Sequence, residues 1–181
     1  MDLYRGLKNA SFLSLANIIS ELIQFTLMIY VVKTLGPEGY GVWVIIVTFT
    51  GAFSVLSFQG LNKVLIREGS KDINKMNETL EDFIAIRNIF SLLSIFGCII
   101  ISFFAPYEDQ LKYLILIYSI SLGLGSTRSF LSTIFQASEK FKLLAILTIA
   151  QKILYVILIF SVLHLGYGIF GMIIASLTNE T

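Results

Sequence analysis

Three ionisable residues lie deep inside long apolar runs of this chain: Glu21, Arg128 and Lys152. A charge at the centre of a bilayer costs several kcal/mol, roughly 3 kcal/mol for Lys or Arg on insertion scales. Such residues are therefore expected to face a partner or a water-filled cavity inside a helix bundle. Two bases against one acid would attract an anionic substrate such as a phosphate or pyrophosphate, which Arg binds bidentately and Lys binds as a point charge.

Helical spacing places further polar residues on the same face as each charge. Ser14 shares the face of Glu21, Ser121 and Ser132 share that of Arg128, and Thr148 shares that of Lys152. Three helices would then each present a polar face, which is typical of a bundle around a hydrated cavity. The predicted cavity residues are Asn17, Glu21, Gln24, Arg128, Gln151, Lys152 and Tyr155.

A purely structural role for these charges stays open. Glu21 would then pair with Lys152 or Arg128 and hold helices together, as polar residues do in membranes. Arg128 lies nearer one end of its run and would snorkel to the interface, as we also expect of Arg87. In a cavity, Glu21 would either keep the empty site neutral or titrate and couple transport to protons.

Composition limits the class of protein. The chain has 181 residues, of which 56% are hydrophobic and only 14% charged, whereas soluble domains carry about 25% charged residues. We therefore expect an integral membrane protein. The net charge of +1 gives no indication of a nucleic-acid partner. Because the chain has only one cysteine (Cys98) and one histidine (His164), we expect no metal site, cofactor or catalytic residue.

The apolar runs predict an all-α multi-span bundle, because a spanning helix needs about 20 apolar residues. We expect five full transmembrane helices within one transmembrane domain, residues 1–181. The predicted spans are Ser11 to Val32, Val42 to Phe58, Phe83 to Ala105, Tyr113 to Phe135 and Leu143 to Leu165. A sixth, from Gly168 to Leu177, is only half long enough to span, which suggests that it is truncated or that the chain is part of something longer.

Lys and Arg in the loops predict the orientation. Eight of them lie before the first span or in the loops after the second and fourth, and two, Lys33 and Lys112, lie on the other side. The N-terminus is therefore expected in the cytoplasm, and the loops at 36–41 and 106–112 outside. Residues 60–82 carry a basic face beside an apolar stripe, which predicts an amphipathic cytoplasmic connector near the headgroups.

Several segments together suggest a family. The loop at Leu35 reads LGPEGYG and is followed by Trp43; Leu65 to Glu68 reads LIRE; and Phe135 to Lys142 reads FQASEKFK. Pro37 and the glycines of the first segment predict a compact turn. Along essentially its whole length, the chain resembles the N-terminal half of lipid-linked oligosaccharide flippases. These are the polysaccharide biosynthesis export proteins of the multidrug/oligosaccharidyl-lipid/polysaccharide exporter superfamily.

The resemblance implies one lobe of a MATE-like transporter with alternating access at a central cavity. It further implies a polyprenyl-pyrophosphate-linked oligosaccharide, moved from the cytoplasmic to the outer leaflet of the cell membrane. Family cavities are cationic, which fits Arg128 and Lys152. The implied partners are the bilayer and a second lobe or other membrane proteins of polysaccharide assembly. A lone lobe is not expected to transport.

Three alternatives remain at this stage. A proton- or sodium-coupled multidrug antiporter of the same superfamily would use Glu21 as its ion site. A membrane enzyme would need paired acids or a His–acid pair, and His164 has no acid near it in the sequence. A nonfunctional truncated fragment or a structural subunit would account for the short sixth segment.

Overall fold

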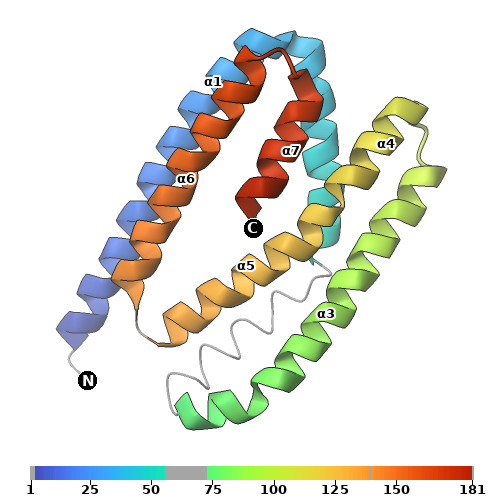
Figure 1. The fold of residues 1–181 in the computed structure, drawn as a ribbon. Helices are drawn as coiled ribbons and strands as arrows, with labels where there is room; N and C mark the ends of the chain where they lie inside the picture. The colour runs from blue at the N-terminus through green and yellow to red at the C-terminus, as the bar shows by residue number, and fades with distance from the viewer. Residues whose placement is uncertain (1–2, 56–72, 139, 181) are drawn as a thin grey trace.

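The protein is a bundle of long helices, shown in Figure 1 as a computed structural model. The structure describes residues 3–55, 73–138 and 140–180, with side chains for 11–55, 80–138 and 140–180. Within these ranges every regular element is a helix, which confirms the all-α prediction. The helices are α1 (Leu3–Ser54), α3 (Ile73–Phe104), α4 (Asp109–Tyr118), α5 (Ile120–Ala137), α6 (Phe141–His164) and α7 (Gly168–Glu180).

A single glycine folds α1 back on itself (Figure 1). Gly36 has φ 72° and ψ 172°, a backbone region open essentially only to glycine. Pro37 follows at once, where its preset φ suits the first position of a helix. The loop expected at 36–41 is therefore narrower than predicted, because Gly39 and Gly41 are already helical. Gly39 instead gives close packing, since a Cβ there would lie 3.1 Å from that of Leu35.

Four helical stretches are long and apolar enough to cross a membrane: Ser11–Ser54, Leu80–Phe104, Asp109–Ala137 and Phe141–His164. The first of these is two helices joined at Gly36, so the four stretches correspond to the five predicted spans, the second of them as far as Ser54. Large apolar side chains such as Leu22, Ile89 and Phe104 are exposed along these helices, as expected of lipid-facing surfaces.

Residues that end or interrupt helices, such as Pro and Gly, lie at most of the ends of the spans. α3 ends at Phe104, two residues before Pro106, which disfavours helical backbone in the residue before it. The predicted fourth span is α4 plus α5, with a local irregularity at Ser119, whose hydroxyl donates to the Leu116 carbonyl at 2.7 Å. Between α6 and α7 the turn is made by Gly166 and Gly168, both at positive φ.

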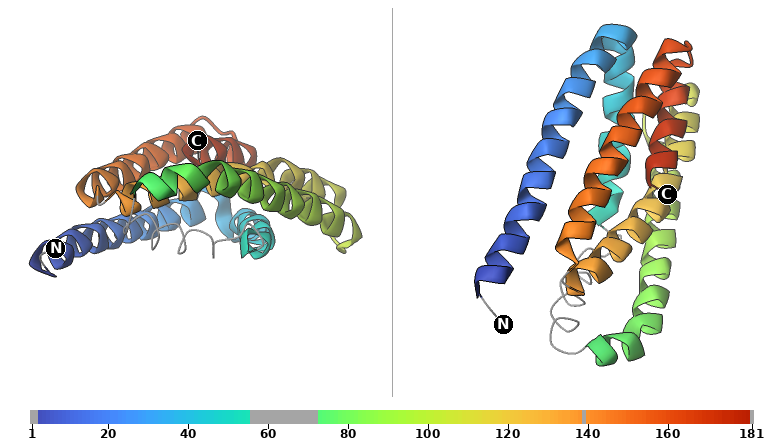
Figure 2. Two further views of the ribbon diagram at one scale, coloured as in Figure 1. Left: turned by 90° about the horizontal axis from the view of Figure 1, so that it is seen from below. Right: turned by 60° about the vertical axis from the view of Figure 1, so that its left-hand side comes forward.

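The short helix α7 is wedged among the longer helices. Met172 and Ala175 pack against Leu27 and Val31 of α1 and Ile159 of α6. On its other side Ile173 joins a second apolar cluster with Ile46 of α1, Cys98 of α3, Ile115 of α4 and Leu122 of α5. α1 and α6 run side by side along their lengths (Figure 2). The apolar packing around α7 thus determines how the two sides of the bundle face each other.

The turns alternate between the two ends of the bundle. The bend in α1 and the α6–α7 turn lie at the top of Figure 1, the α3–α4 turn lies at its upper right, and the α5–α6 junction lies towards the bottom. The predicted connector at 60–82 lies outside the described residues up to 72; from Ile73 its backbone is the beginning of α3.

We expect Gly36→Ala to lower the stability of the detergent-solubilised protein by about 1–3 kcal/mol, because a Cβ is strained at φ 72° and ψ 172°. Gly41→Ala is the matched control: it lies in helical backbone with open space around it. Thermal unfolding followed by circular dichroism measures both. Equal midpoints for the two variants would contradict the assigned role of Gly36.

Candidate functional site

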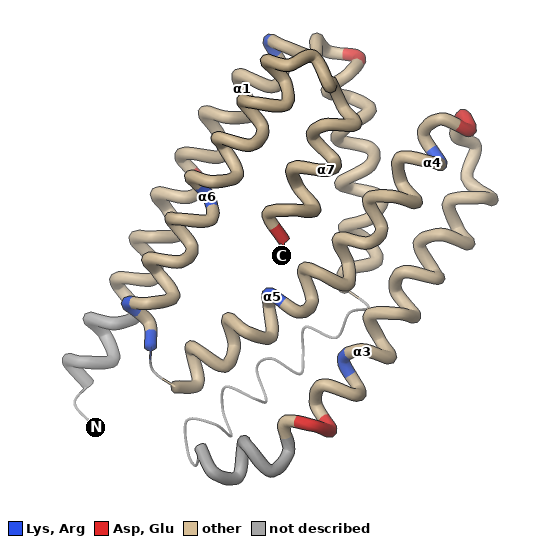
Figure 3. Tube along the Cα trace, in the orientation of Figure 1, with Lys and Arg blue, Asp and Glu red and all other residues tan. Residues whose placement is uncertain are grey.

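A polar cavity of about 270 Å³ lies where α1, α5, α6 and α7 approach each other. It contains both cations singled out from the sequence, Arg128 of α5 and Lys152 of α6. The side chains that line it are Gln24, Trp43, Val47, Tyr118, Arg128, Thr148, Lys152, Tyr155, Ser176, Asn179 and Glu180. In Figure 3 the acidic end of α7 lies between the cationic positions of α5 and α6. Charged side chains from three helices thus meet within the bundle.

Lys152 is held from two directions. Its Nζ donates a hydrogen bond of 2.9 Å to Oε1 of Gln24 on α1, and it lies 5.8 Å from the ring centre of Tyr155, one turn further along α6. Glu21 and Glu180 also attract the ammonium group, whereas Arg128 repels it. Because lipid supplies no acceptor, these contacts keep the ammonium group inside the bundle.

Arg128 is paired with an acid of α7. Its Nη1 lies 3.4 Å from Oε2 of Glu180, and the two side chains are 34% and 30% exposed. One turn earlier on α7, the Ser176 hydroxyl lies 3.2 Å from that of Tyr155. Ser176 and Glu180 are four residues apart and so share one helix face. This face of α7 therefore contacts α6 through Ser176 and α5 through Glu180.

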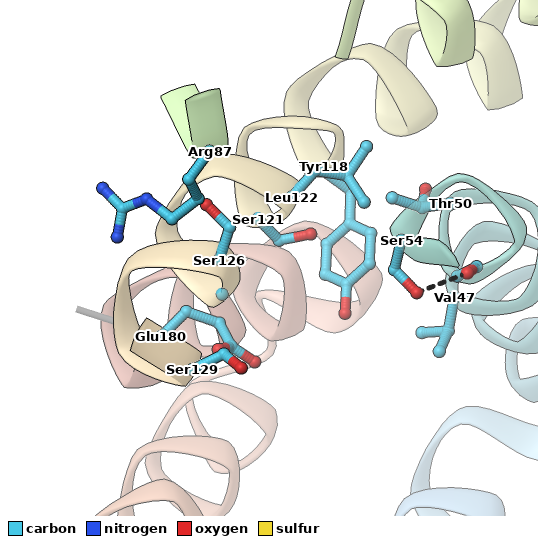
Figure 4. A pocket seen from close by; sticks show the side chains of 12 residues that line it. Val47, Thr50, Ser54, Arg87, Tyr118, Ser121, Leu122, Ser126, Ser129 and Glu180 are labelled. Carbon is cyan, nitrogen blue, oxygen red and sulfur yellow. Dashed lines mark hydrogen bonds between the residues drawn. The ribbon is translucent and has the colours of Figure 1, made fainter. Parts of the chain in front are cut away.

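A second cavity of about 260 Å³ adjoins the first and shares Val47, Tyr118 and Glu180 with it. Figure 4 shows Tyr118 between serines of α5 on one side and Thr50 and Ser54 of α1 on the other. The Tyr118 ring also meets that of Trp43 edge-on, with 5.5 Å between ring centres. The two cavities together form a polar groove, with the paired charges at their junction.

Arg87 lines the second cavity rather than simply snorkelling as expected. Its guanidinium carbon lies 4.8 Å from the ring centre of Phe130, and its Nη2 donates to Oδ1 of Asn88 at 2.9 Å. In Figure 4 the guanidinium group points away from Tyr118. Arg87 therefore braces α3 against α5 at the edge of the groove.

The structure brings together four of the seven predicted residues: Gln24, Arg128, Lys152 and Tyr155. Asn17 and Glu21 are exposed, and Gln151 is half-buried, and none of the three is among the lining residues. Asn17 and Glu21 lie on the part of α1 before Gln24, whereas the apolar contacts of α7 with α1 are at Leu27 and Val31.

The pairing expected for Glu21 is replaced by other contacts. Lys152 binds Gln24 and Arg128 binds Glu180. Glu180 was not predicted, because in the sequence it follows a short apolar run and reads as part of a polar tail. The signal available was its spacing of four residues from Ser176, which extends the helix face.

The part of the chain that the structure describes offers no set of side chains that could bind a metal ion. No group of three or more His, Cys, Asp or Glu side chains there could hold an ion. His164 stacks on Phe160 at 6.2 Å between ring centres, and Cys98 is fully buried in the apolar cluster. What the groove offers is therefore charge and hydrogen bonding.

Comparison with known proteins identifies the family. No curated protein sequence and no solved structure matches the chain. The family model described as polysaccharide biosynthesis protein matches residues 6–179, which is nearly the whole chain and includes every residue that lines the groove except Glu180. Together with the spanning helices, this match makes the chain a multi-pass membrane protein of a polysaccharide-related exporter family. The chain belongs to the polysaccharide biosynthesis protein family.

Proposed function

We propose that the protein translocates a polyprenyl-pyrophosphate-linked oligosaccharide from the cytoplasmic to the outer leaflet of the cell membrane. The observation that carries this proposal is the meeting of Arg128 and Lys152, from two different helices, in one polar cavity within the bundle. A guanidinium group and an ammonium group are suited to a pyrophosphate, the first by paired hydrogen bonds and the second by charge.

Membership of the exporter family supports transport as the activity. In this proposal the groove forms one side of the substrate cavity. A second lobe, from further sequence or from another membrane protein of polysaccharide assembly, would supply the other side. The two lobes would rock around the bound headgroup, so that the cavity opens first to one leaflet and then to the other.

The contacts that Lys152 and Arg128 make are suited to reversible binding of the substrate. In the empty lobe each cation has an oxygen partner, Gln24 for Lys152 and Glu180 for Arg128. Gln24 is neutral and leaves the charge of Lys152 uncancelled by direct contact. The pyrophosphate would therefore be drawn to the cavity, yet it would leave again when the protein's own oxygens return to the cations.

We expect Lys152→Ala and Arg128→Ala each to lower transport severely. Each variant removes a charge-assisted contact of about 1.5–3 kcal/mol, which corresponds to roughly ten- to a hundredfold in affinity. The measurement is flipping of a lipid-linked oligosaccharide by the full protein in proteoliposomes, together with polysaccharide export in cells.

Lys142→Ala is the matched control, because Lys142 lies on the same helix but is exposed and contacts the ring of Phe12 instead of the cavity. It should transport normally. Normal export by Lys152→Ala and Arg128→Ala at wild-type protein levels would remove both residues from the substrate site.

We also propose that the N-terminus lies in the cytoplasm, from the excess of Lys and Arg on that side. A cysteine at exposed Glu108 should then react with a membrane-impermeant maleimide added to intact cells, and one at exposed Lys140 only after lysis. The native Cys98 has 0% exposure and so gives little background. The reverse labelling pattern would invert the proposed orientation.

A further inference from the structure

Glu180 occupies the position at Arg128 that an anionic substrate would take. Its Oε2 lies 3.4 Å from the guanidinium Nη1, and both side chains border the same cavity. The same carboxylate also reaches over the second cavity, where it lies 3.4 Å from the position of a Cβ on Gly125. A pyrophosphate binding to Arg128 would therefore have to compete with a carboxylate of the protein itself.

Two polar contacts join α7 to its neighbours beside the cavity. Ser176 contacts Tyr155 of α6 at 3.2 Å, and Glu180 contacts Arg128 of α5. The apolar anchors Met172 and Ile173 lie about two turns before Glu180 on the same helix. Loss of the Glu180 contact would therefore leave the apolar anchors of α7 in place.

We propose that Glu180 is an internal counter-ion that neutralises Arg128 in the empty lobe and that the anionic headgroup displaces it, releasing the Glu180 turn of α7 from α5. This inference rests on the proposed function. It assigns to Glu180 the neutralising role that the sequence suggested for Glu21. Binding of substrate would thereby be coupled to movement of a helix that packs on α1, α4, α5 and α6.

The Arg128–Glu180 ion pair is strong enough to neutralise the empty site and weak enough for an anionic ligand to displace the carboxylate. Ion pairs exposed by about a third contribute modestly, because water screens them. Their loss is readily offset by a pyrophosphate, which carries more charge and accepts paired hydrogen bonds from a guanidinium group. While Glu180 competes, the apparent affinity for the anion is lowered by the strength of the pair.

Binding of farnesyl pyrophosphate to the full protein in detergent micelles tests the competition, with farnesol as the uncharged control. We expect Glu180→Gln to raise the affinity for farnesyl pyrophosphate about fivefold and to leave that for farnesol unchanged. In an Arg128→Gln background, where the affinity is already low, Glu180→Gln should add nothing, since the two residues act as one pair.

Glu21→Gln separates direct competition from a general change in charge. It removes the same charge from an acid that also acts on Lys152 but forms no ion pair with Arg128 within the described residues. It should change the affinity by less than about twofold, because screening weakens the more distant charge. An equal gain in Glu21→Gln and Glu180→Gln, or a gain that persists without Arg128, would overturn the inference. Unchanged binding in Arg128→Gln and Lys152→Gln would instead overturn the proposed function.

A distance measurement tests the movement of α7. Spin labels on cysteines at Thr127 of α5 and Thr178 of α7 replace exposed side chains that hydrogen-bond only within their own helices. Farnesyl pyrophosphate should lengthen the label-to-label distance in the otherwise native protein, and Glu180→Gln should lengthen it without ligand. An unchanged distance in both cases would show that Glu180 does not hold α7 to α5.

Discussion

A cation inside a bilayer must find an oxygen acceptor on another helix, because lipid offers none. Lys152 of α6 reaches Gln24 of α1, and Arg128 of α5 reaches Glu180 of α7. The Tyr155 hydroxyl adds a contact between α6 and α7. These few polar contacts join four helices around one cavity. Much of the arrangement of the bundle therefore follows from satisfying two positive charges.

Apolar packing supplies the complementary constraint. The side chains of Met172, Ile173 and Ala175 of α7 are buried in two clusters that together draw on all the other described helices. Ser176 and Glu180 of the same helix border the cavity. The helix thus takes part both in the apolar packing of the bundle and in the wall of the polar groove. An element with both roles is suited to couple events in the groove to the packing of the bundle.

The character of the groove narrows the chemistry further. Its walls combine three cations, one carboxylate and the hydroxyl groups of serines, threonines and tyrosines from several helices. Such a surface is suited to an anionic headgroup with many hydroxyl groups rather than to an apolar cation. For a family of polysaccharide-related exporters, an oligosaccharide carried on a lipid pyrophosphate combines these properties in one molecule.

Much of the fold followed from local sequence. Runs of apolar residues of the required length predicted the spans, and Gly36, Pro37 and Pro106 marked turns because their backbone restrictions act within one or two residues. The site followed in part: helical spacing on α6 placed Lys152 and Tyr155 on one face, and both line the cavity.

The partners of the charges depended on tertiary structure. Asn17 and Glu21 share the periodicity of Gln24, yet of the three only Gln24 contacts Lys152 of α6 and lines the cavity. Glu180 pairs with Arg128, 52 residues away in sequence, because α7 packs back between the longer helices. The sequence by itself determined which residues must avoid lipid, since that depends on side-chain chemistry and helical period. Only the tertiary structure decided which of them meet, since that depends on how α1, α5, α6 and α7 pack against one another.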